Sequence, residues 1–228
     1  MININAQVQR PVLSLYRNSG QQVNFTVNYS SLDVQNPYHD LKVVILQNGR
    51  WDNRIEGVKP LFDKNKILEY DNQEETVFPG GNEYRWFDIK SLRYQSPYIK
   101  SVNFEKDKFY VDLFPDKNRS GKQYFYEEDF NGRYYIEVQE EDKDQITADY
   151  AQINFEFPYE APAVNGDFYL MGELTNNIFS ERNKMKYDFS SGSYKLNLLL
   201  KQGYYNYQYA FVSDNSNTGS LKMMEGNY

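Results

Sequence analysis

The residue types that most often carry out catalysis are scarce in this chain. Its 228 residues include no cysteine and a single histidine, His39. Without cysteine there can be no disulfide, no thiol nucleophile and no cysteine-based zinc site. A Ser-His-Asp arrangement would have to use His39, which lies beside a proline in a turn-like stretch. We interpret His39 as a surface turn residue, and we predict no catalytic residue, no cofactor and no metal site.

Acidic residues are numerous, but their spacing is not that of a metal-binding loop. They cluster at Glu127–Asp129 and at Glu140–Asp144. Calcium requires about six to eight oxygen ligands from a defined loop, and neither cluster has the spaced Asp-x-Asp-x-Asp-Gly pattern. We interpret both clusters as solvated hairpin tips, with calcium binding as the alternative. A carboxylate pair for glycoside hydrolysis depends on the fold and cannot be singled out among 32 acidic residues.

Two segments combine a glycine turn with an adjacent arginine and tryptophan. They are Gln47–Asn53 and Phe78–Asp88, and they contain both tryptophans of the chain. Their glycines are expected to supply backbone angles that other residues avoid. Gly80-Gly81 is not followed by the Lys-Ser/Thr of a phosphate loop and is not part of a Gly-x-Ser-x-Gly motif. We expect the two segments to pack together and to define the shape of the larger domain.

The arginine and tryptophan side chains of these segments have a structural and a functional interpretation. In the structural one, the arginines pair with acidic neighbours and stack on the tryptophans. In the functional one, the residues form an exposed patch with the composition of a protein–protein hot spot. The candidate interaction residues are therefore Arg50, Trp51, Arg85 and Trp86.

Three tyrosines alternate with polar residues near the end of the chain. Tyr205, Tyr207 and Tyr209 would lie on one face of a strand. Such a row could be a platform on which sugars stack, or it could be the core face of a sandwich. Alternate spacing in an aromatic-rich chain favours the core. The three tyrosines remain the candidate carbohydrate-binding residues of the alternative function.

The bulk composition narrows the classes of partner. A net charge of −7 argues against nucleic acid, because phosphate binding needs concentrated lysine and arginine. No apolar run approaches the roughly 20 residues of a membrane-spanning helix. Aromatic residues make up 17% of the chain, and many alternate with polar residues, which is typical of strands.

Short alternating segments predict an all-β protein with no substantial helix. The strands are expected near residues 2–8, 21–29, 41–46, 67–70, 84–89, 108–113, 133–138, 151–157, 168–170, 194–200 and 205–209. The run at 41–46, which is apolar except for Lys42, predicts a strand buried on both sides. The segment 140–144 is expected to be the tip of a hairpin joining the strands at 133–138 and 151–157.

The prolines at 158 and 162 predict a stiff interdomain linker. The chain would then consist of two tandem β-sandwiches of immunoglobulin-like or early-set type, residues 1–158 and residues 159–228. The first would be a Greek-key antiparallel sandwich. The second has only about 65 residues after the linker, which is marginal for a sandwich. We therefore expect it to be truncated or to pair its open edge with another element.

One long pattern resembles a known family. Val43-Val-Ile-Leu-Gln-Asn-Gly-Arg-Trp-Asp-Asn53 is followed by Phe78-Pro-Gly-Gly-Asn-Glu-Tyr-Arg-Trp-Phe-Asp88 and then by Ser91-Leu-Arg93. This pattern is similar to that of the plug protein family of the type IX secretion system, a system of the Bacteroidota. The resemblance runs from about Gln21 to Tyr150. Because members of the family are longer, it implies that this chain is an internal fragment that lacks the signal peptide.

The resemblance implies a non-enzymatic role on the periplasmic side of the outer membrane. Proteins of this family dock on the outer-membrane translocon, a giant β-barrel, and block it when no cargo is in transit. The expected partner is therefore that translocon, and the expected location is the inner face of the outer membrane. The resemblance does not say which residues touch the translocon. The alternative function is a carbohydrate-binding β-sandwich protein of the periplasm or cell surface.

The end of the chain also looks like an early-set sandwich of the glycogen-binding-module type. The similarity covers Gly166–Glu173 and Gly203–Val212. Those modules stack sugars on tryptophans, and this part of the chain has none. The similarity therefore concerns the fold alone.

Overall fold

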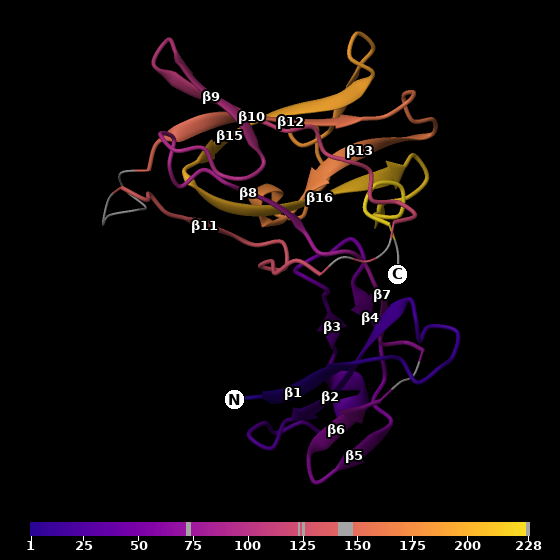
Figure 1. Ribbon diagram of the computed structural model, residues 1–228. Helices are drawn as coiled ribbons and strands as arrows, with labels where there is room; N and C mark the ends of the chain where they lie inside the picture. Colours follow the sequence, from indigo (N-terminus) through magenta and orange to yellow (C-terminus); the bar gives the residue numbers. More distant parts are fainter. Residues whose placement is uncertain (72–73, 123, 125, 141–147, 227–228) are drawn as a thin grey trace. The chain divides into compact units, whose positions relative to one another are not determined.

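The computed structural model describes residues 1–71, 74–122, 124, 126–140 and 148–226. Strands account for 42% of the chain and helices for 3%, which confirms the all-β prediction. The chain divides into two compact units, Met1–Gly81 and Asn82–Gly226 (Figure 1). Within the described ranges no helix has both the length and the apolar character needed to cross a membrane.

The first unit is built on one antiparallel sheet. Its elements are β1 (Asn3–Gln9), β2 (Gly20–Asn28), α1 (Pro37–Asp40), β3 (Val44–Ile45), β4 (Ile55–Glu56), β5 (Phe62–Lys64), β6 (Ile67–Tyr70) and β7 (Val77–Pro79). The sheet has the order β1-β2-β6-β5, and β7 also pairs with β2. Strands β3 and β4 form a separate two-stranded ladder.

The alternation along β2 produces the core of the first unit. Phe25 and Val27 point to the buried face, where they meet Leu68 of β6. The Phe25 ring stacks on Tyr70 with a centroid distance of 4.4 Å. The apolar run at 41–46 was predicted to be a strand buried on both sides, and that prediction is wrong. Only Val44 and Ile45 are in a strand, and Val44 is exposed, because the run packs one side against this small core.

The two glycine turns behave differently. Asn48 and Gly49 both have positive φ, at 53° and 72°, as expected for an Asn-Gly turn. Gly80 and Gly81, in contrast, do not have positive φ. A β-carbon built on Gly81 would have no neighbouring atom within 4 Å. The expectation that this second pair supplies special backbone angles is therefore wrong.

The second unit is a β-sandwich of two sheets. Its elements are β8 (Arg85–Asp88), β9 (Ile99–Glu105), β10 (Lys108–Leu113), β11 (Tyr134–Ile136), β12 (Tyr150–Pro158), β13 (Gly166–Met171), η1 (Glu173–Thr175), β14 (Lys186–Asp188), β15 (Ser193–Lys201), β16 (Gly203–Ser213) and β17 (Gly219–Ser220). One sheet has the order β14-β15-β12-β10-β9. The other has the order β11-β16-β13, with β8 and β17 also paired to β16.

Inward-facing aromatic residues of both sheets form the core of this unit. Phe155 and Phe157 come from β12, and Tyr205, Tyr207 and Tyr209 come from β16. The three tyrosines are only 2%, 2% and 0% exposed. The interpretation of the tyrosine row as a core face is confirmed. These residues cannot be the sugar-stacking platform of the alternative function, because their rings are not accessible.

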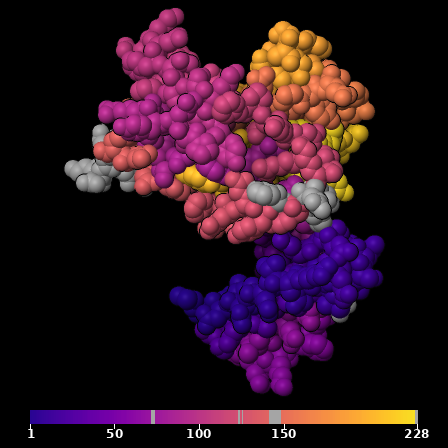
Figure 2. Space-filling view, viewed as in Figure 1, coloured from indigo at the N-terminus to yellow at the C-terminus, as the bar shows by residue number. Residues whose placement is uncertain are grey.

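The boundary between the two compact units follows Gly81, whereas the predicted domain boundary was between residues 158 and 159. Strand β12 belonged to the first expected domain, but it pairs along its whole length with β15, from Tyr150–Lys201 to Pro158–Ser193. Strand β8 likewise pairs with β16. The short second sandwich is thus completed by strands from upstream in the chain, which satisfies its open edges. Figure 2 shows this mixing as magenta, orange and yellow segments on the surface of the second unit.

Two predicted connections, a hairpin and an interdomain linker, are also wrong. Strands β11 and β12 do not form a hairpin, because β11 pairs with β16 and β12 lies between β10 and β15. Strand β12 runs parallel to β10, so the ladder is not purely antiparallel. The presumed linker after Pro158 is a packed crossover between the two sheets, in which the Tyr187 hydroxyl donates to the Tyr159 carbonyl at 2.9 Å. Residues 141–144 of the expected hairpin tip lie outside the described residues.

Gly203 is expected to be intolerant of a side chain. It pairs with Ile136 of β11, and a β-carbon there would lie 2.3 Å from the Tyr135 carbonyl oxygen. We predict that Gly203→Ala lowers the free energy of unfolding by about 1–3 kcal/mol, because the two strands must move apart. Gly81→Ala is the control and should change stability by less than about 0.5 kcal/mol. Urea titrations of both variants measure this, and equal midpoints would contradict the prediction.

Candidate functional site

The side chains singled out for catalysis or metal binding do not converge. His39 is in α1 with an exposed side chain, and its Nδ1 lies 3.0 Å from the neighbouring Asp40 carboxylate. The surface interpretation of His39 is thus confirmed. Across residues 1–71, 74–122, 124, 126–140 and 148–226 there is no group of three or more potential metal-ligating side chains. The calcium alternative for Glu127–Asp129 gains no support from this geometry.

In the first unit, the arginine and the tryptophan of the 47–53 segment have opposite environments. The Arg50 guanidinium is buried, and it donates to both oxygens of Asp52 at 3.0 and 2.6 Å. Such bidentate pairs are strong and well oriented. Trp51 is 58% exposed. The structural interpretation therefore holds for Arg50, while Trp51 remains available at the surface.

In the second unit, Arg85 lies in the interior of the sandwich. Its side chain is 5% exposed, and its Nε donates to both oxygens of the fully buried Glu225 at 2.9 and 3.1 Å. Its Nη1 donates to Asp116 at 2.9 Å, and its Nη2 donates to the Lys117 carbonyl at 2.8 Å. Burial alone would lower the pKa of Arg85, but the charges of Glu225 and Asp116 outweigh it and raise the pKa.

The tyrosine row completes this buried ionic network. The hydroxyls of Tyr207 and Tyr209 both donate to Oδ2 of Asp116, at 2.8 and 2.6 Å. The Arg85 guanidinium also lies 5.5 Å from the centre of the Tyr209 ring. Arg85 therefore stacks on a tyrosine rather than on Trp86, and it is not accessible to a partner. The network connects β8, β16 and the two segments that carry Asp116 and Glu225, and its role is structural.

Trp86 has a different position, because it points to the outer face of the same sheet. Three neighbouring strands each place one aromatic residue on this face: Trp86 from β8, Tyr204 from β16 and Tyr135 from β11. Two loop residues, Tyr98 and Phe130, flank them. We call these five residues the aromatic strip.

The rings of the aromatic strip contact one another in sequence. Trp86 stacks on Tyr204 at 5.4 Å between centroids, and Tyr204 stacks on Tyr135 at 5.6 Å. Phe130 packs edge-on against Tyr204 at 5.3 Å, and Tyr98 packs edge-on against Trp86 at 4.8 Å. These are favourable cross-strand and edge-to-face geometries, which keep the rings in place before any partner arrives.

Glu127 fixes one end of the strip. Its Oε1 accepts hydrogen bonds from Trp86 Nε1 at 2.6 Å and from the Tyr98 hydroxyl at 3.2 Å. Burial and the Glu127 charge raise the pKa of Tyr98. The nearby Asp129 accepts from the backbone N–H groups of Tyr84 and Asn131. The acidic cluster predicted to be a solvated hairpin tip thus positions aromatic residues, so that interpretation is wrong.

Lys90 borders the other end of the strip. Its ammonium group lies 5.6 Å from the centre of the Tyr135 ring, 3.2 Å from Glu137 and 3.6 Å from Asp88. Burial would lower the pKa of Lys90, but these two carboxylates raise it. Tyr98, Phe130 and Tyr135 remain 46%, 51% and 37% exposed. The strip is therefore an apolar surface with a charged border, the composition that interfaces favour.

Of the five residues of the aromatic strip, only Trp86 was among the interaction residues predicted from the sequence. Periodicity placed Tyr135 opposite the inward residues of its strand, which is a usable signal for an outward side chain. It gave no indication that β11 would lie beside β16, since about 65 residues separate them. The two Arg-Trp segments were also expected to pack together. They do touch, because the Gln47 side chain donates to the Pro79 carbonyl at 3.1 Å. The unit boundary follows Gly81, however, so Arg50-Trp51 and Arg85-Trp86 belong to different units and do not define one domain.

Comparisons with known proteins bear on the fold. No model of a known protein family matches this sequence, and no curated protein matches it. A solved structure does match: the crystal structure of a hypothetical protein from Parabacteroides merdae ATCC 43184, at 2.30 Å resolution. Its TM-score is 0.91, and 34% of aligned residues are identical. The alignment covers 100% of this chain and 57% of that protein, so this chain spans a little over half of its length.

Proposed function

We propose that this chain is part of a non-enzymatic periplasmic protein that docks on the outer-membrane translocon of the type IX secretion system and blocks it. The proposal rests on the resemblance of residues 43–53, 78–88 and 91–93 to the plug protein family of that system. The similarity to a protein of Parabacteroides merdae, a member of the Bacteroidota, supports it. A blocking role needs a rigid body with a preformed surface, and it needs no chemistry.

The observation that carries the proposal at residue level is the aromatic strip. Large aromatic residues contribute most of the energy in many protein interfaces, especially where they are held rigid. Trp86 and Tyr204 are half-buried and locked by stacking, while Tyr98 and Phe130 expose about half of their surface. In this proposal the strip contacts the translocon, and Trp86 keeps its predicted role. Arg50 and Arg85 contribute only by stabilising their units.

Removing exposed rings from the strip should weaken docking without unfolding the protein. We predict that Tyr98→Ala combined with Phe130→Ala, in the full-length protein, weakens binding to the translocon by about tenfold or more. Phe189→Ala is the matched control, since Phe189 is an exposed aromatic residue of the same unit that lies outside the strip. Co-purification from detergent-solubilised outer membranes, followed by titration on immobilised translocon, measures the effect.

The possible results distinguish the docking function itself from the surface that makes the contact. If the unaltered protein does not co-purify with the translocon, the proposed function is wrong. If it co-purifies and the double variant binds as tightly as the Phe189→Ala control, docking occurs elsewhere and the strip is not the contact surface. The exposed Trp51 of the first unit would then be the next residue to replace.

The carbohydrate-binding alternative loses the residues on which it was based. Tyr205, Tyr207 and Tyr209 are core residues, and the hydroxyls of the last two are bound to Asp116. A carbohydrate site would have to be elsewhere on the molecule.

A further inference from the structure

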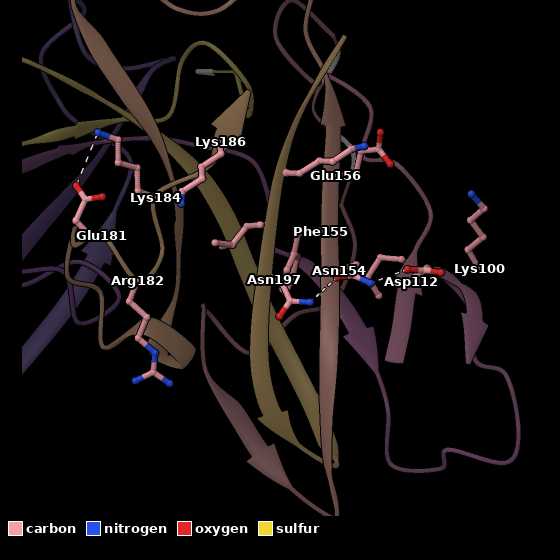
Figure 3. A pocket seen from close by; sticks show the side chains of 13 residues that line it. Lys100, Asp112, Asn154, Phe155, Glu156, Glu181, Arg182, Lys184, Lys186 and Asn197 are labelled. Carbon is pink, nitrogen blue, oxygen red and sulfur yellow. Dashed lines mark hydrogen bonds and ion pairs between the residues drawn. The ribbon is translucent and has the colours of Figure 1, made fainter. Parts of the chain in front are cut away.

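A cleft lies on the sandwich layer opposite the one that carries the aromatic strip. It crosses the outer face of the sheet β14-β15-β12-β10-β9, and residues 181–184 border it (Figure 3). Its volume is about 730 Å³, which is within the range typical of small-molecule sites, roughly 300–1,000 Å³. The proposed docking surface does not include this face, so the cleft could bind a different ligand.

A row of hydrogen-bonded polar side chains forms the floor of the cleft. Asn197 Nδ2 donates to the side-chain oxygen Oδ1 of Asn154 at 2.6 Å, and Asn154 Nδ2 donates to Asp112 Oδ1 at 2.8 Å. Ser101 donates to the second Asp112 oxygen at 2.7 Å. The register places these residues directly opposite one another on four adjacent strands. Figure 3 shows three of them, Asn197, Asn154 and Asp112. These bonds fix both amide orientations and use one N–H of each asparagine, which leaves further donors for hydroxyl groups.

The charge of the cleft is opposite to that of the chain. Five basic and three acidic side chains line it, whereas the chain as a whole carries a net charge of −7. Two of the basic residues are paired: Lys184 with Asp167 at 2.6 Å, and Lys195 with Asp188 at 2.7 Å. Lys100, Arg182 and Lys186 are exposed and have no ion-pair partner among the residues that the structure describes. These three cations can therefore each pair with a ligand, although the carboxylates of Asp112, Glu156 and Glu181 also line the cleft.

The positions of these cations indicate the size of the ligand. Lys100 is on β9 and Lys186 is on β14, the two outermost strands of the sheet. Four strand spacings of about 4.8 Å separate these strands by roughly 19 Å. One small anion cannot contact both ends. A longer ligand with several negative charges can, and its polar groups would lie over the asparagine row between them.

We propose that this cleft binds an acidic oligosaccharide, such as a chain of uronic acids. Carboxylates would pair with Lys100 at one end and with Arg182 and Lys186 at the other, while sugar hydroxyls would bond to Asn154 and Asn197. An acidic peptide fits less well, because the asparagine amides at the centre of the floor are suited to sugar hydroxyls. The site does not depend on the docking role.

The experiment uses a defined probe and reads two properties. Hexagalacturonate is titrated into the chain, and binding is followed by calorimetry and by the NMR signals of the side-chain amides. We expect binding at low salt that shifts the Asn154 and Asn197 amide signals. The double variant Arg182→Ala/Lys186→Ala should bind about tenfold or more weakly. Lys222→Ala, which removes an exposed lysine of the same unit outside the cleft, should bind as the unaltered chain does.

Several results would overturn the proposal. The absence of any shift in the two amides on adding hexagalacturonate would exclude binding at this floor. Equal affinity for a neutral hexasaccharide would show that the cations do not select the ligand. If hexaglutamate shifted the same amides with equal or higher affinity, the ligand class would be an acidic peptide instead. The variants replace exposed side chains, and unchanged unfolding midpoints would verify that any loss of binding is local.

Discussion

Replacing Arg85 with methionine is expected to lower the free energy of unfolding of the second unit by about 3–5 kcal/mol. The guanidinium makes four hydrogen bonds to Glu225, Asp116 and Lys117 in the interior of the sandwich. Without it, the fully buried carboxylate of Glu225 would keep only Arg119 as a positive partner, at 3.9 Å and with a side chain that is 28% exposed. Breaking one side of a buried pair costs far more than the pair gains over apolar packing.

A second substitution separates charge from packing. Glu225→Gln keeps an oxygen that can accept from the Tyr209 backbone N–H, a bond of 3.0 Å in the native unit. The double variant Arg85→Met/Glu225→Gln should therefore recover part of the stability that Arg85→Met loses, since it removes the uncompensated charge. A double-mutant cycle by urea unfolding, monitored by near-ultraviolet circular dichroism, gives the coupling energy. Additive losses would contradict the ionic interpretation.

The control for the Arg85 variant is a surface ion pair in the same unit. Lys195 and Asp188 lie 2.7 Å apart, but their side chains are 44% and 34% exposed. Lys195→Ala should change stability by less than about 1 kcal/mol, because exposed pairs are screened by solvent. A loss as large as that of Arg85→Met would show that burial is not the deciding factor.

The second large effect is a loss of stability at alkaline pH. Burial, followed by the charge of Asp116, raises the pKa values of Tyr207 and Tyr209 well above their ordinary range. The folded state therefore keeps both protons at pH values where the unfolded chain has lost them. Stability is fully present below a pH of about 10 and falls above it, at about 1.4 kcal/mol per pH unit for each tyrosine. Together the two should cost about 3 kcal/mol per pH unit.

Other tyrosines shift in the same direction, so the effect is a lower bound. Burial raises the pKa of Tyr204 to about 12, and burial also raises the pKa of Tyr205. Unfolding midpoints in urea, measured in steps from a pH of about 8 to about 11, give the slope directly. The variant Tyr207→Phe/Tyr209→Phe should start from lower stability, because Asp116 loses two donors, and should show a shallower slope. An unchanged slope would contradict the assignment to this pair.

Local patterns along the sequence predicted most strands but not how they associate. The ranges 67–70 and 108–113 match β6 and β10, and the alternation in 205–209 identified the inward face of β16. Strands β9 and β14 were missed. Both are edge strands, which need not alternate: β9 has one buried side chain, at its first residue, and β14 has none.

The domain boundary was misplaced because proline was interpreted without knowledge of its surroundings. Pro158 ends β12 as a terminal residue, and the chain then crosses between the two layers of one sandwich. A proline is tolerated at the end of a strand for the same reason that it is tolerated in a linker, namely that no ladder donor is needed there. Sequence alone does not distinguish these cases.

At the candidate site, too, some features follow from the sequence and others only from the tertiary structure. Residue types determined that no thiol or histidine-rich chemistry is available, that two Arg-Trp pairs are distinctive, and that alternate tyrosines belong to a core. Only the tertiary structure decided that Arg85 is buried with Glu225, 140 residues away in sequence, while its neighbour Trp86 joins the aromatic strip. Periodicity assigns a side chain to one of two faces. Which strands become neighbours depends on long-range pairing, and so does the set of residues that meet on each face.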